Sequence, residues 1–328
     1  MLSNYNLKSL AFAAVLVHIC FGVSKGHLQT GFYSQTCPEA ETIVLNVVRS
    51  AVSDDHRIAA KLLRLFFHDC FVQGCDGSIL VDDGERNARE HLGVGGFEVI
   101  ENAKTELEEN CPGVVSCADI VALAARDAVF LSKGPFIEVP TGRRDGLISE
   151  VGLAADLPDV DDSTEVLKSK FQHKGLSDKD LLLLSAGGHS IGTTACFFMP
   201  NRLYNFHGEG DSDPEINPRL LPQLKDQCPF DGDSNVRIPL DLGSESTFDA
   251  HIFQNIRNGF AVIASDARLY DDRNIKKMVD TYAQGFSRSR RRRSSFQNDF
   301  AVAMVKLGTI GVKTGEDGEI RRVCNALN

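Results

Sequence analysis

The distribution of cysteines constrains the fold of this 328-residue chain more than any other feature. Eight of the nine cysteines lie between Cys37 and Cys324, and the ninth, Cys20, lies in an apolar stretch near the N-terminus. An even number of cysteines in an exported chain indicates disulfides, so eight predict four bridges and leave their connectivity open. Structural zinc explains them poorly, because no Cys-x-x-Cys pair occurs and only Cys70 has a suitably placed histidine nearby.

The first 26 residues have the order of a secretory signal peptide. Lys8 precedes an apolar run, and Ser24 and Gly26 supply the small residues of a cleavage site. The alternative, an amphipathic first helix of a cytosolic protein, fits poorly because the run is apolar on every side. The run is also too short for a membrane span. We therefore predict a signal peptide over residues 1–26 and a single domain over residues 27–328.

The charge balance excludes one class of partner. The net charge is −10, and loss of the signal peptide, which carries two lysines and no acid, would make it −12. A surface this acidic argues against nucleic acid as a partner. A basic island, Arg288 with Arg290–Arg293, interrupts the pattern and predicts a solvated loop. A sharper hypothesis is that these arginines attach the protein to an acidic polysaccharide such as pectin, which salt-dependent retention on polygalacturonate would test.

Apolar residues at helical spacing predict a mostly helical domain without an internal linker. The predicted helices cover residues 39–53, 58–68, 97–110, 118–131, 163–174, 180–186, 248–260 and 296–306. Ser177 followed by Asp180 predicts a capping box at the start of the sixth helix. Strand signals are few and short, at residues 136–139 and 318–321. The predicted fold class is all-α with minor short β elements.

The segment from Arg64 to Ser78 contains the most informative side chains. Arg64 and His68 are four residues apart, so both project from one face of a helix that is otherwise apolar. A guanidinium and an imidazole that face an apolar space need a partner other than water. A structural salt bridge for Arg64 and a core histidine for His68 are the ordinary alternatives.

The second half of this segment weighs against those alternatives because it is rich in oxygen ligands. Carboxylate, hydroxyl and carbonyl oxygens recur there at short spacing, and a bridge between two flanking cysteines could staple the loop. Hard oxygen ligands of this kind suit Ca2+. The candidate ligands are Asp69, Val72, Gly74, Asp76 and Ser78. A calcium ion bound there would fix the end of the helix that presents His68.

A second candidate site joins two distant segments. The helix that follows Ser177 stops at a pair of glycines and places His189 at its C-terminal end. Asp266 follows an apolar stretch far downstream and provides a buried carboxylate. A histidine held by a carboxylate suits an axial metal ligand, because the hydrogen bond fixes the ring and raises its basicity. By itself this pairing is weak support.

Together these segments closely resemble the class III secretory plant peroxidases, over essentially the whole mature chain. The matching motifs are the segment 64–78, SAGGHSIG at 185–192, CPGVVSCAD at 111–119, GRRDG at 142–146 and AVAMVKLG at 301–308. The resemblance implies a haem-peroxidase fold in which two helical halves enclose one haem b, with two Ca2+ ions. It implies an enzyme that reduces hydrogen peroxide to water and oxidises phenolic donors by one-electron steps, in peroxide removal, the oxidative stress response and cell-wall lignin chemistry.

The resemblance assigns roles to the matching positions. His68 is implied as the distal acid–base, Arg64 as the stabiliser of developing charge, and Phe67 as a side chain packed over the haem. His189 is implied as the axial iron ligand, oriented by Asp266. The implied calcium ligands are the distal set above with Glu85 holding a water, and a proximal set of Ser190, Asp241, Ser244, Thr247 and Asp249.

Other implied features are structural or lie at the haem edge. The implied disulfides are Cys37–Cys111, Cys70–Cys75, Cys117–Cys324 and Cys196–Cys228. Asp119 and Arg143 match the family's buried ion pair, and Pro158 and Phe198 match residues at the exposed haem edge where reductants dock. We expect a monomer that is secreted to the cell wall or apoplast. A vacuolar location fits less well, because the sequence shows no long C-terminal extension.

One position departs from the family pattern in a way that affects the mechanism. Where the family has an asparagine that accepts a hydrogen bond from the distal histidine, this sequence has His91. A neutral imidazole can accept that bond through a ring nitrogen, whereas an imidazolium cannot. We therefore predict that peroxide activation falls at acid pH through a second titration, beyond that of His68. In addition, the chain contains no tryptophan, and Ile137 stands where many members have one, so a tryptophan radical route is excluded.

Two other interpretations compete with an active plant enzyme. A calcium-stabilised secreted binding protein that has kept the fold but lost catalysis predicts damage at the key positions. Arg64, His68, His189 and Asp266 are all intact. A fungal-type lignin or manganese peroxidase fits poorly, because no tryptophan is available at the surface and the cysteine spacings follow the plant pattern. The sequence favours the plant enzyme.

Overall fold

The computed structural model describes residues 27–284 and 295–328. The predicted signal peptide and the basic island of Arg288 with Arg290–Arg293 therefore lie outside the described residues. In the part that is described, helices dominate, and the one sheet consists of two antiparallel strands, β1 (Thr193–Ala195) and β2 (Arg237–Pro239). No helix within these two ranges is long and apolar enough to cross a membrane.

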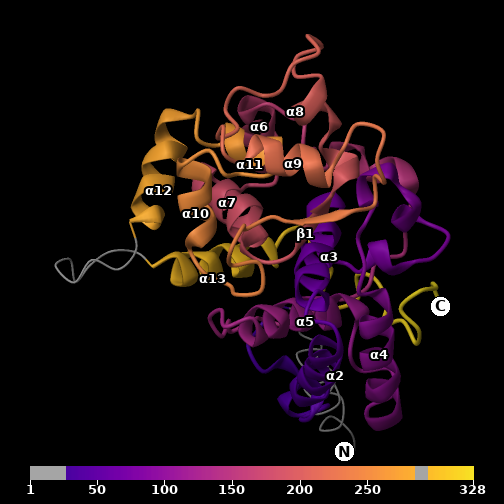
Figure 1. Cartoon of the computed structure of the whole chain (residues 1–328). Coiled ribbons are helices and arrows are strands. Elements are labelled where there is room, and N and C mark those ends of the chain that lie inside the picture. Colours follow the sequence, from indigo (N-terminus) through magenta and orange to yellow (C-terminus); the bar gives the residue numbers. More distant parts are fainter. Residues whose placement is uncertain (1–26, 285–294) are drawn as a thin grey trace, which may run out of the picture.

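Three helices form one half of the molecule, namely α2 (Ala40–Asp54), α4 (Phe97–Asn110) and α5 (Cys117–Leu131) (Figure 1). The helix α3 (Ile58–Val72) runs from this half toward the other one. Ser116 starts α5 by accepting a hydrogen bond from the Asp119 backbone at 3.1 Å. Residues 117–129 of α5 are all buried, which explains its apolar character on every face.

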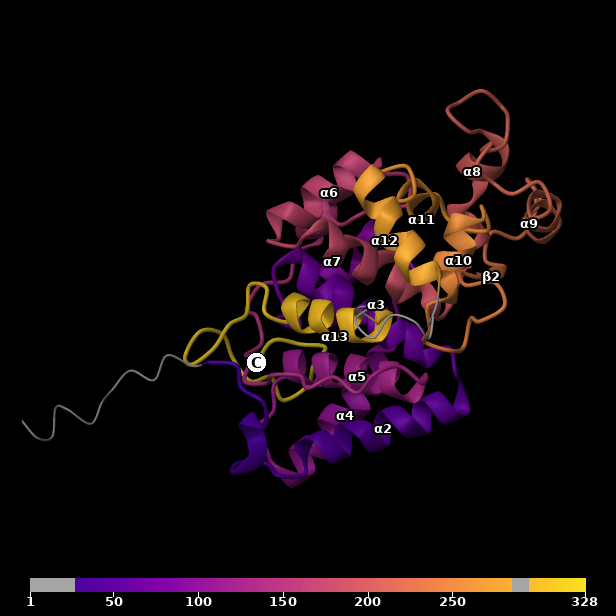
Figure 2. The same cartoon turned by 90° about the vertical axis from the view of Figure 1, so that its left-hand side faces the viewer.

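The second half contains seven helices. They are α6 (Thr164–His173), α7 (Asp178–Leu182), α8 (Pro200–Tyr204), α9 (Leu221–Gln227), α10 (His251–Arg257), α11 (Ala264–Arg268) and α12 (Arg273–Ala283). The helix α13 (Phe296–Leu307) lies between the two halves in both views (Figures 1 and 2). One large apolar core extends through both halves, and a smaller one, with Met199, Leu203, Leu224 and Ile238, lies among α8, α9 and β2.

The strand predictions were wrong. Ile137 and Val139 are buried as a strand pattern would require, but residues 136–139 pair with no other strand. In the segment 318–321, only Glu319 makes an isolated bridge, with Asp145. Residues 136–139 form an extended segment that packs into the core, and residues 318–321 form one that pairs with the loop at Asp145. The true strands are only three residues long, too short for a period-two pattern to reveal them.

Three helix predictions needed correction at their ends, and the helix predicted over 58–68 continues to Val72. The helix predicted over 248–260 begins at His251, because the Asp249 carboxylate accepts a hydrogen bond from the His251 backbone at 2.8 Å and forms the preceding turn. The helix predicted over 180–186 begins at Asp178 and continues after Leu182 as a wider π turn over Leu183–Gly187. Its predicted capping box, Ser177 with Asp180, is confirmed.

Candidate active site

A cavity of about 830 Å3 lies where α3 faces the short turns that follow α7. The α3 helix contributes Arg64, Phe67 and His68 to its lining. The 3-10 turn Gly188–Ser190 contributes His189. The two segments that the sequence selected separately therefore line one cavity, which is large enough for a cofactor-sized ligand.

Arg64 and His68 form a hydrogen-bonded pair in this cavity. The Arg64 Nε donates to His68 Nε2 at 3.0 Å, and the Arg64 Nη2 donates to the Leu92 carbonyl at 3.2 Å. Burial lowers the pKa of Arg64 to about 10, and the nearby charge of Arg237 adds to this effect. Burial also holds the pKa of His68 well below its usual range, with the Arg64 charge as the next cause. His68 is therefore a neutral base at neutral pH.

His91 occupies the position behind His68, as the sequence predicted for the hydrogen-bond acceptor. The two Nδ1 atoms lie 2.9 Å apart. Arg64 can only donate, so His68 Nε2 must accept and His68 Nδ1 must carry the proton. His68 Nδ1 therefore donates to His91 Nδ1. The other ring nitrogen of His91, Nε2, lies 3.3 Å from Glu85 Oε1, and both side chains are fully buried.

These contacts form a chain that fixes every tautomer in it. Because His91 Nδ1 accepts from His68, a neutral His91 carries its proton on Nε2, which lies near Glu85 Oε1 without forming a hydrogen bond to it. His68 Nε2 is therefore unprotonated, and its single lone pair accepts the hydrogen bond from Arg64 Nε. On the far side, Ser78 Oγ donates to Glu85 Oε2 at 3.1 Å. Glu85 therefore lies between the histidine pair and the segment predicted to bind calcium.

His189 is held by Asp266, which lies on α11. The His189 Nδ1 is 3.0 Å and 3.1 Å from the two carboxylate oxygens of Asp266. Asp266 is only 1% exposed, so its charge is little screened by solvent. Because Nδ1 donates to the carboxylate, the Nε2 lone pair remains available as a metal ligand. The π turn Leu183–Gly187, directly before this histidine, is a local irregularity of the kind often found at functional sites.

The chain is similar in sequence to proteins of one known family. The protein-family model described as peroxidase matches residues 44–285. The chain belongs to the class III plant peroxidases. It is 57% identical to Peroxidase 43 of Arabidopsis thaliana over 322 residues, which cover 97% of this chain and 98% of that protein. It is also 57% identical to Peroxidase 13 of Arabidopsis thaliana over 324 residues, which cover 98% of this chain and 99% of that protein. It is 48% identical to Peroxidase N1 of Nicotiana tabacum over 304 residues, which cover 92% of this chain and 90% of that protein.

Family membership makes the protein a peroxidase and implies a haem cofactor. The residues of this peroxidase fit a haem in the cavity. An imidazole with a carboxylate partner is present to bind iron, and apolar side chains such as Phe67, Leu184 and Ile191 line the space around it. The predicted reductant residues Pro158 and Phe198 line the same cavity. Phe197, 48% exposed, packs edge-to-face on Phe198 and extends that edge toward solvent.

The predicted distal calcium ligands lie together in the peroxidase. Asp69 is fully buried, and neither carboxylate oxygen has a hydrogen-bond partner among the described side chains and backbone. Burial raises the pKa of Asp69 well above its usual range, with the charges of Asp76 and Glu85 as further causes. Buried carboxylates this close are unfavourable without a cation, so the donor chemistry fits Ca2+.

No three His, Cys, Asp or Glu side chains of the described residues form a metal cluster, so a cation bound here would also need backbone and hydroxyl oxygens as ligands. Ser78 is buried next to Glu85. The Val72 carbonyl accepts a hydrogen bond from Lys174 Nζ at 2.6 Å and has a second lone pair free. Gly74 has a φ of 113°, and a Cβ there would lie 2.6 Å from Gly311, so only glycine allows this turn.

Arg321 holds the end of the loop that follows α3, residues 73–78, which is called the distal loop below. No local pattern in the sequence predicts this role. This arginine is 0% exposed. Its Nη1 donates to the carbonyl oxygens of Gly77 and Cys324, both at 2.9 Å. Its Nη2 donates to those of Asp76, at 3.2 Å, and Gly146, at 3.4 Å. One side chain near the C-terminus thus joins the backbone at Asp76 and Gly77 to two other segments.

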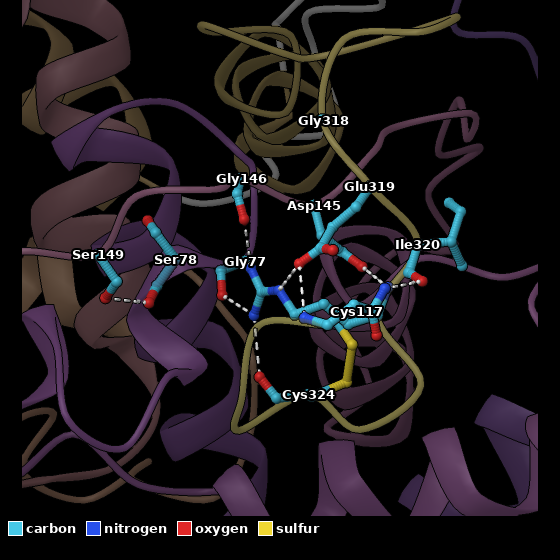
Figure 3. Close-up of polar contacts among 12 residues, drawn as sticks. Gly77, Ser78, Cys117, Asp145, Gly146, Ser149, Gly318, Glu319, Ile320 and Cys324 are labelled. Carbon is cyan, nitrogen blue, oxygen red and sulfur yellow. Dashed lines mark hydrogen bonds and ion pairs between the residues drawn. A yellow bond between two sulfur atoms is a disulfide. The ribbon is translucent and has the colours of Figure 1, made fainter.

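Asp145 completes this junction, which Figure 3 shows with Gly77, Gly146 and the Cys117–Cys324 disulfide converging from separate segments. Its Oδ1 accepts a hydrogen bond from the Ala118 backbone and its Oδ2 one from the Arg321 backbone, each at 2.9 Å. Burial raises the pKa of Asp145, and Arg321 opposes that shift. The junction therefore ties the start of α5 and the C-terminal segment to the distal loop.

The predicted proximal calcium ligands also lie close together. The Ser190 Oγ and the Asp241 Oδ2 are buried and have no hydrogen-bond partner among the described residues. Burial raises the pKa of Asp241 to about 6. The Ser244 Oγ donates to Asp249 Oδ2 at 2.7 Å, and Thr247 follows in the same turn. These unpaired oxygens fit a hard cation.

The remaining predicted pairs lie where the resemblance implies them. The four disulfides of the structure are Cys37–Cys111, Cys70–Cys75, Cys117–Cys324 and Cys196–Cys228. The Arg143 Nη1 donates to Asp119 Oδ1 at 2.7 Å, and both side chains are buried. The Tyr33 hydroxyl also donates to Asp119 at 2.6 Å, which leaves that carboxylate well satisfied.

Proposed function

We propose that this peroxidase binds one haem b in the large cavity, with His189 as its iron ligand and with Arg64 and His68 on the side where peroxide reacts. The observation that carries this proposal is the pairing of a base with an unprotonated Nε2 and a carboxylate-held histidine in one cavity. Haem iron supplies the site that binds peroxide and the electrons that split its O–O bond. The rest of the chemistry belongs to the side chains.

His68 moves the proton that makes peroxide cleavable. Its Nε2 accepts the proton of the nearer peroxide oxygen and returns it to the farther one, which then leaves as water. Arg64, which donates to the same Nε2 in the resting enzyme, stabilises the negative charge that develops on the leaving oxygen. His91 keeps the Nδ1 proton of His68 engaged, so that Nε2 stays the basic nitrogen.

Asp266 orients His189 on the opposite side of the cavity. As a buried acceptor for the Nδ1 proton, it fixes the ring of His189 and raises the basicity of its Nε2. Two phenolic donors at the edge marked by Pro158, Phe198 and the exposed Phe197 then give one electron and one proton each. The net reaction is one hydrogen peroxide and two phenols to two waters and two phenoxyl radicals.

We further infer two Ca2+ ions, at the distal and proximal ligand sets, that hold the ends of the segments bearing His68 and His189. We place the mature domain at residues 27–328, as an extracellular monomer of the cell wall or apoplast. Attachment to an acidic wall polysaccharide through Arg288 and Arg290–Arg293 is part of this proposal. Unchanged, salt-independent retention on polygalacturonate after replacement of these arginines by serine would remove the attachment.

An absorption spectrum of the haem-reconstituted enzyme tests the central proposal. One equivalent of peroxide should partly bleach the ferric Soret band, and guaiacol should restore it in two successive phases, one for each electron. The same spectrum tests the alternative of a catalytically weak, calcium-stabilised binding protein. A chain that binds no haem, or whose Soret band ignores peroxide, would favour that alternative.

A further inference from the structure

A row of aromatic rings leads from the haem cavity to a buried tyrosine, and no step of the peroxidase reaction uses it. Phe300 on α13 lines the cavity and is only 1% exposed. Its ring centroid lies 5.8 Å from that of Phe296, which lies 6.2 Å from that of Tyr282 near the end of α12. These spacings are typical of aromatic rings in contact, so the three rings form a continuous path of packed atoms.

The same rings pack against the turn that bears the proximal histidine. Gly187 lies two residues before His189. A Cβ at Gly187 would lie 2.8 Å from Phe296 Cε2 and 3.6 Å from Phe300 Cδ2. Electron transfer through a protein weakens steeply with distance and is fastest through closely packed atoms. The geometry therefore favours the exchange of an electron between a haem in the cavity and Tyr282.

Tyr282 also has the partner that the oxidation of a phenol requires. A phenol that loses an electron becomes a strong acid, so its proton must pass to a nearby base. The Tyr282 hydroxyl donates to Asp299 Oδ2 at 2.7 Å, and Lys179 Nζ lies 2.9 Å from the other oxygen, Oδ1. Burial raises the pKa of Tyr282, and the hydrogen bond to Asp299 adds to this effect, so the phenol keeps its proton at rest.

The other tyrosines of the described residues are less suited to this role. The chain contains no tryptophan, so tyrosine is its most easily oxidised aromatic side chain. The rings of Tyr33 and Tyr204 pack on phenylalanines that do not line the cavity. Tyr270 also donates to a carboxylate, Asp280 Oδ1, at 2.9 Å. However, Lys276 Nζ lies 4.3 Å from the centroid of the Tyr270 ring, and this positive charge opposes the loss of an electron.

We propose that Tyr282 is an internal electron donor to the peroxide-oxidised haem, with Asp299 as its proton acceptor. This inference rests on the haem site proposed above. One electron passes from Tyr282 to the haem, which loses one of its two oxidising equivalents, and the phenol proton passes to Asp299 Oδ2. The products are a neutral tyrosyl radical and a protonated Asp299. The radical holds one oxidising equivalent away from the haem while no phenol occupies the haem edge.

Electron paramagnetic resonance of the holoenzyme, frozen soon after addition of one equivalent of peroxide without a reductant, tests this proposal. We expect a tyrosyl radical signal that narrows in protein containing ring-deuterated tyrosine. Tyr282→Phe keeps the ring packing and should lose most of this signal. Tyr270→Phe, the matched control, should keep it. The Soret band of each variant, recorded on the same sample, shows whether haem is bound and oxidised.

A change at Asp299 separates the proton acceptor from the ring path. An amide does not take up the proton as a carboxylate does, so Asp299→Asn should lower the yield of the radical although Tyr282 and its neighbouring rings are unchanged. Lys179→Gln removes the ion pair that Asp299→Asn also loses, and it should keep the signal. Stopped-flow absorption gives a second readout. Without a reductant, the peroxide-oxidised haem should decay more slowly in Tyr282→Phe than in the unaltered enzyme or in Tyr270→Phe.

Three outcomes would overturn the proposal. A signal of equal size in Tyr282→Phe would place the radical on another tyrosine. Equal yields in Asp299→Asn and the unaltered enzyme would remove Asp299 as the proton acceptor. A bleached Soret band without a tyrosyl signal in the unaltered enzyme would exclude internal electron donation and leave the haem proposal intact. A Soret band that ignores peroxide would instead overturn the haem proposal together with this one.

Discussion

The distal and proximal sides of the haem cavity are built in different ways. On the distal side, Arg64 and His68 are one helical turn apart on α3, and their partner His91 follows before α4 begins. On the proximal side, His189 and Asp266 are 77 residues apart and meet only because α11 packs beside the turn after α7. The distal chemistry depends on a local hydrogen-bond chain, whereas the proximal chemistry depends on correct tertiary packing.

Removal of the distal base should have the largest effect. His68→Leu removes the base that Arg64 contacts, so the rate of reaction with peroxide should fall about 10²- to 10⁴-fold. Stopped-flow absorption at the Soret band measures this rate. His173→Gln, a change of an exposed histidine on α6, is the control and should leave the rate unchanged. A loss of less than about tenfold in His68→Leu would remove His68 from the proposed role.

Asp266→Asn should have the next largest effect. It weakens the hydrogen bond from His189 and leaves the distal hydrogen bonds of His68 unchanged. The amide is a weaker acceptor than a carboxylate, so His189 becomes less basic. The rate with peroxide should fall about 10- to 100-fold, and the Fe(III)/Fe(II) potential should rise. Spectroelectrochemistry measures the potential, which a merely structural defect would not shift in this direction. Asp271→Asn, at an exposed carboxylate beyond α11, is the control.

Changes at His91 should have a smaller effect, and they test the hydrogen bond from His68 to His91. His91→Leu removes the acceptor for His68 Nδ1, so the rate with peroxide should fall about tenfold. His91→Asn keeps an acceptor oxygen and should stay within about threefold of the unaltered enzyme at neutral pH. Equal rates in all three proteins would show that the acceptor behind His68 is dispensable.

The pH dependence of the same variants separates the two histidines. The lowered pKa of His68 means that its neutral, active form persists below pH 6.5, and activity is lost only as pH falls through that lowered value. Protonation of His91 adds a second loss, because an imidazolium offers no acceptor to His68. The acid limb should therefore be steeper in the unaltered enzyme than in His91→Asn. Identical acid limbs would contradict a role for His91 protonation.

The difference between local contacts on the distal side and tertiary contacts on the proximal side also explains which features could be predicted from the sequence. The common face of Arg64 and His68 follows from helical periodicity, and α5 follows from a long apolar run. The pairing of His189 with Asp266 rested on a resemblance, because no local pattern links residues 77 apart. The short helices α8, α9, α11 and the amphipathic α12 were missed, the first three because five to seven residues give too few turns for a period.

The buried charges were the least predictable feature. Arg321 and Arg202 look like ordinary surface arginines in the sequence, since arginine is seldom fully buried. The burial of Arg321 depends on carbonyl oxygens supplied by segments far along the chain, such as that of Gly77. Propensity and periodicity contain no information about such long-range partners.

Arg321→Met should have the smallest effect on the reaction itself and a large one on stability. The change leaves the carbonyl oxygens of Gly77 and Cys324 without their donor and Asp145 without its countercharge, so the free energy of unfolding should fall by about 3 to 5 kcal/mol. Denaturant titration of the holoenzyme measures this loss. Arg144→Met, which removes one half-buried hydrogen bond to the Gly318 carbonyl, should cost only about 1 kcal/mol.

The rate with peroxide at saturating Ca2+ should stay within about threefold in Arg321→Met, because His68, His91 and Glu85 keep their contacts. Stability lost with the rate kept would show that the C-terminal junction holds the distal loop in the fold without taking part in proton transfer. A rate loss comparable with that of His91→Leu would instead show that the distal side is not locally built, since its proton chain would then depend on a contact from the far end of the chain.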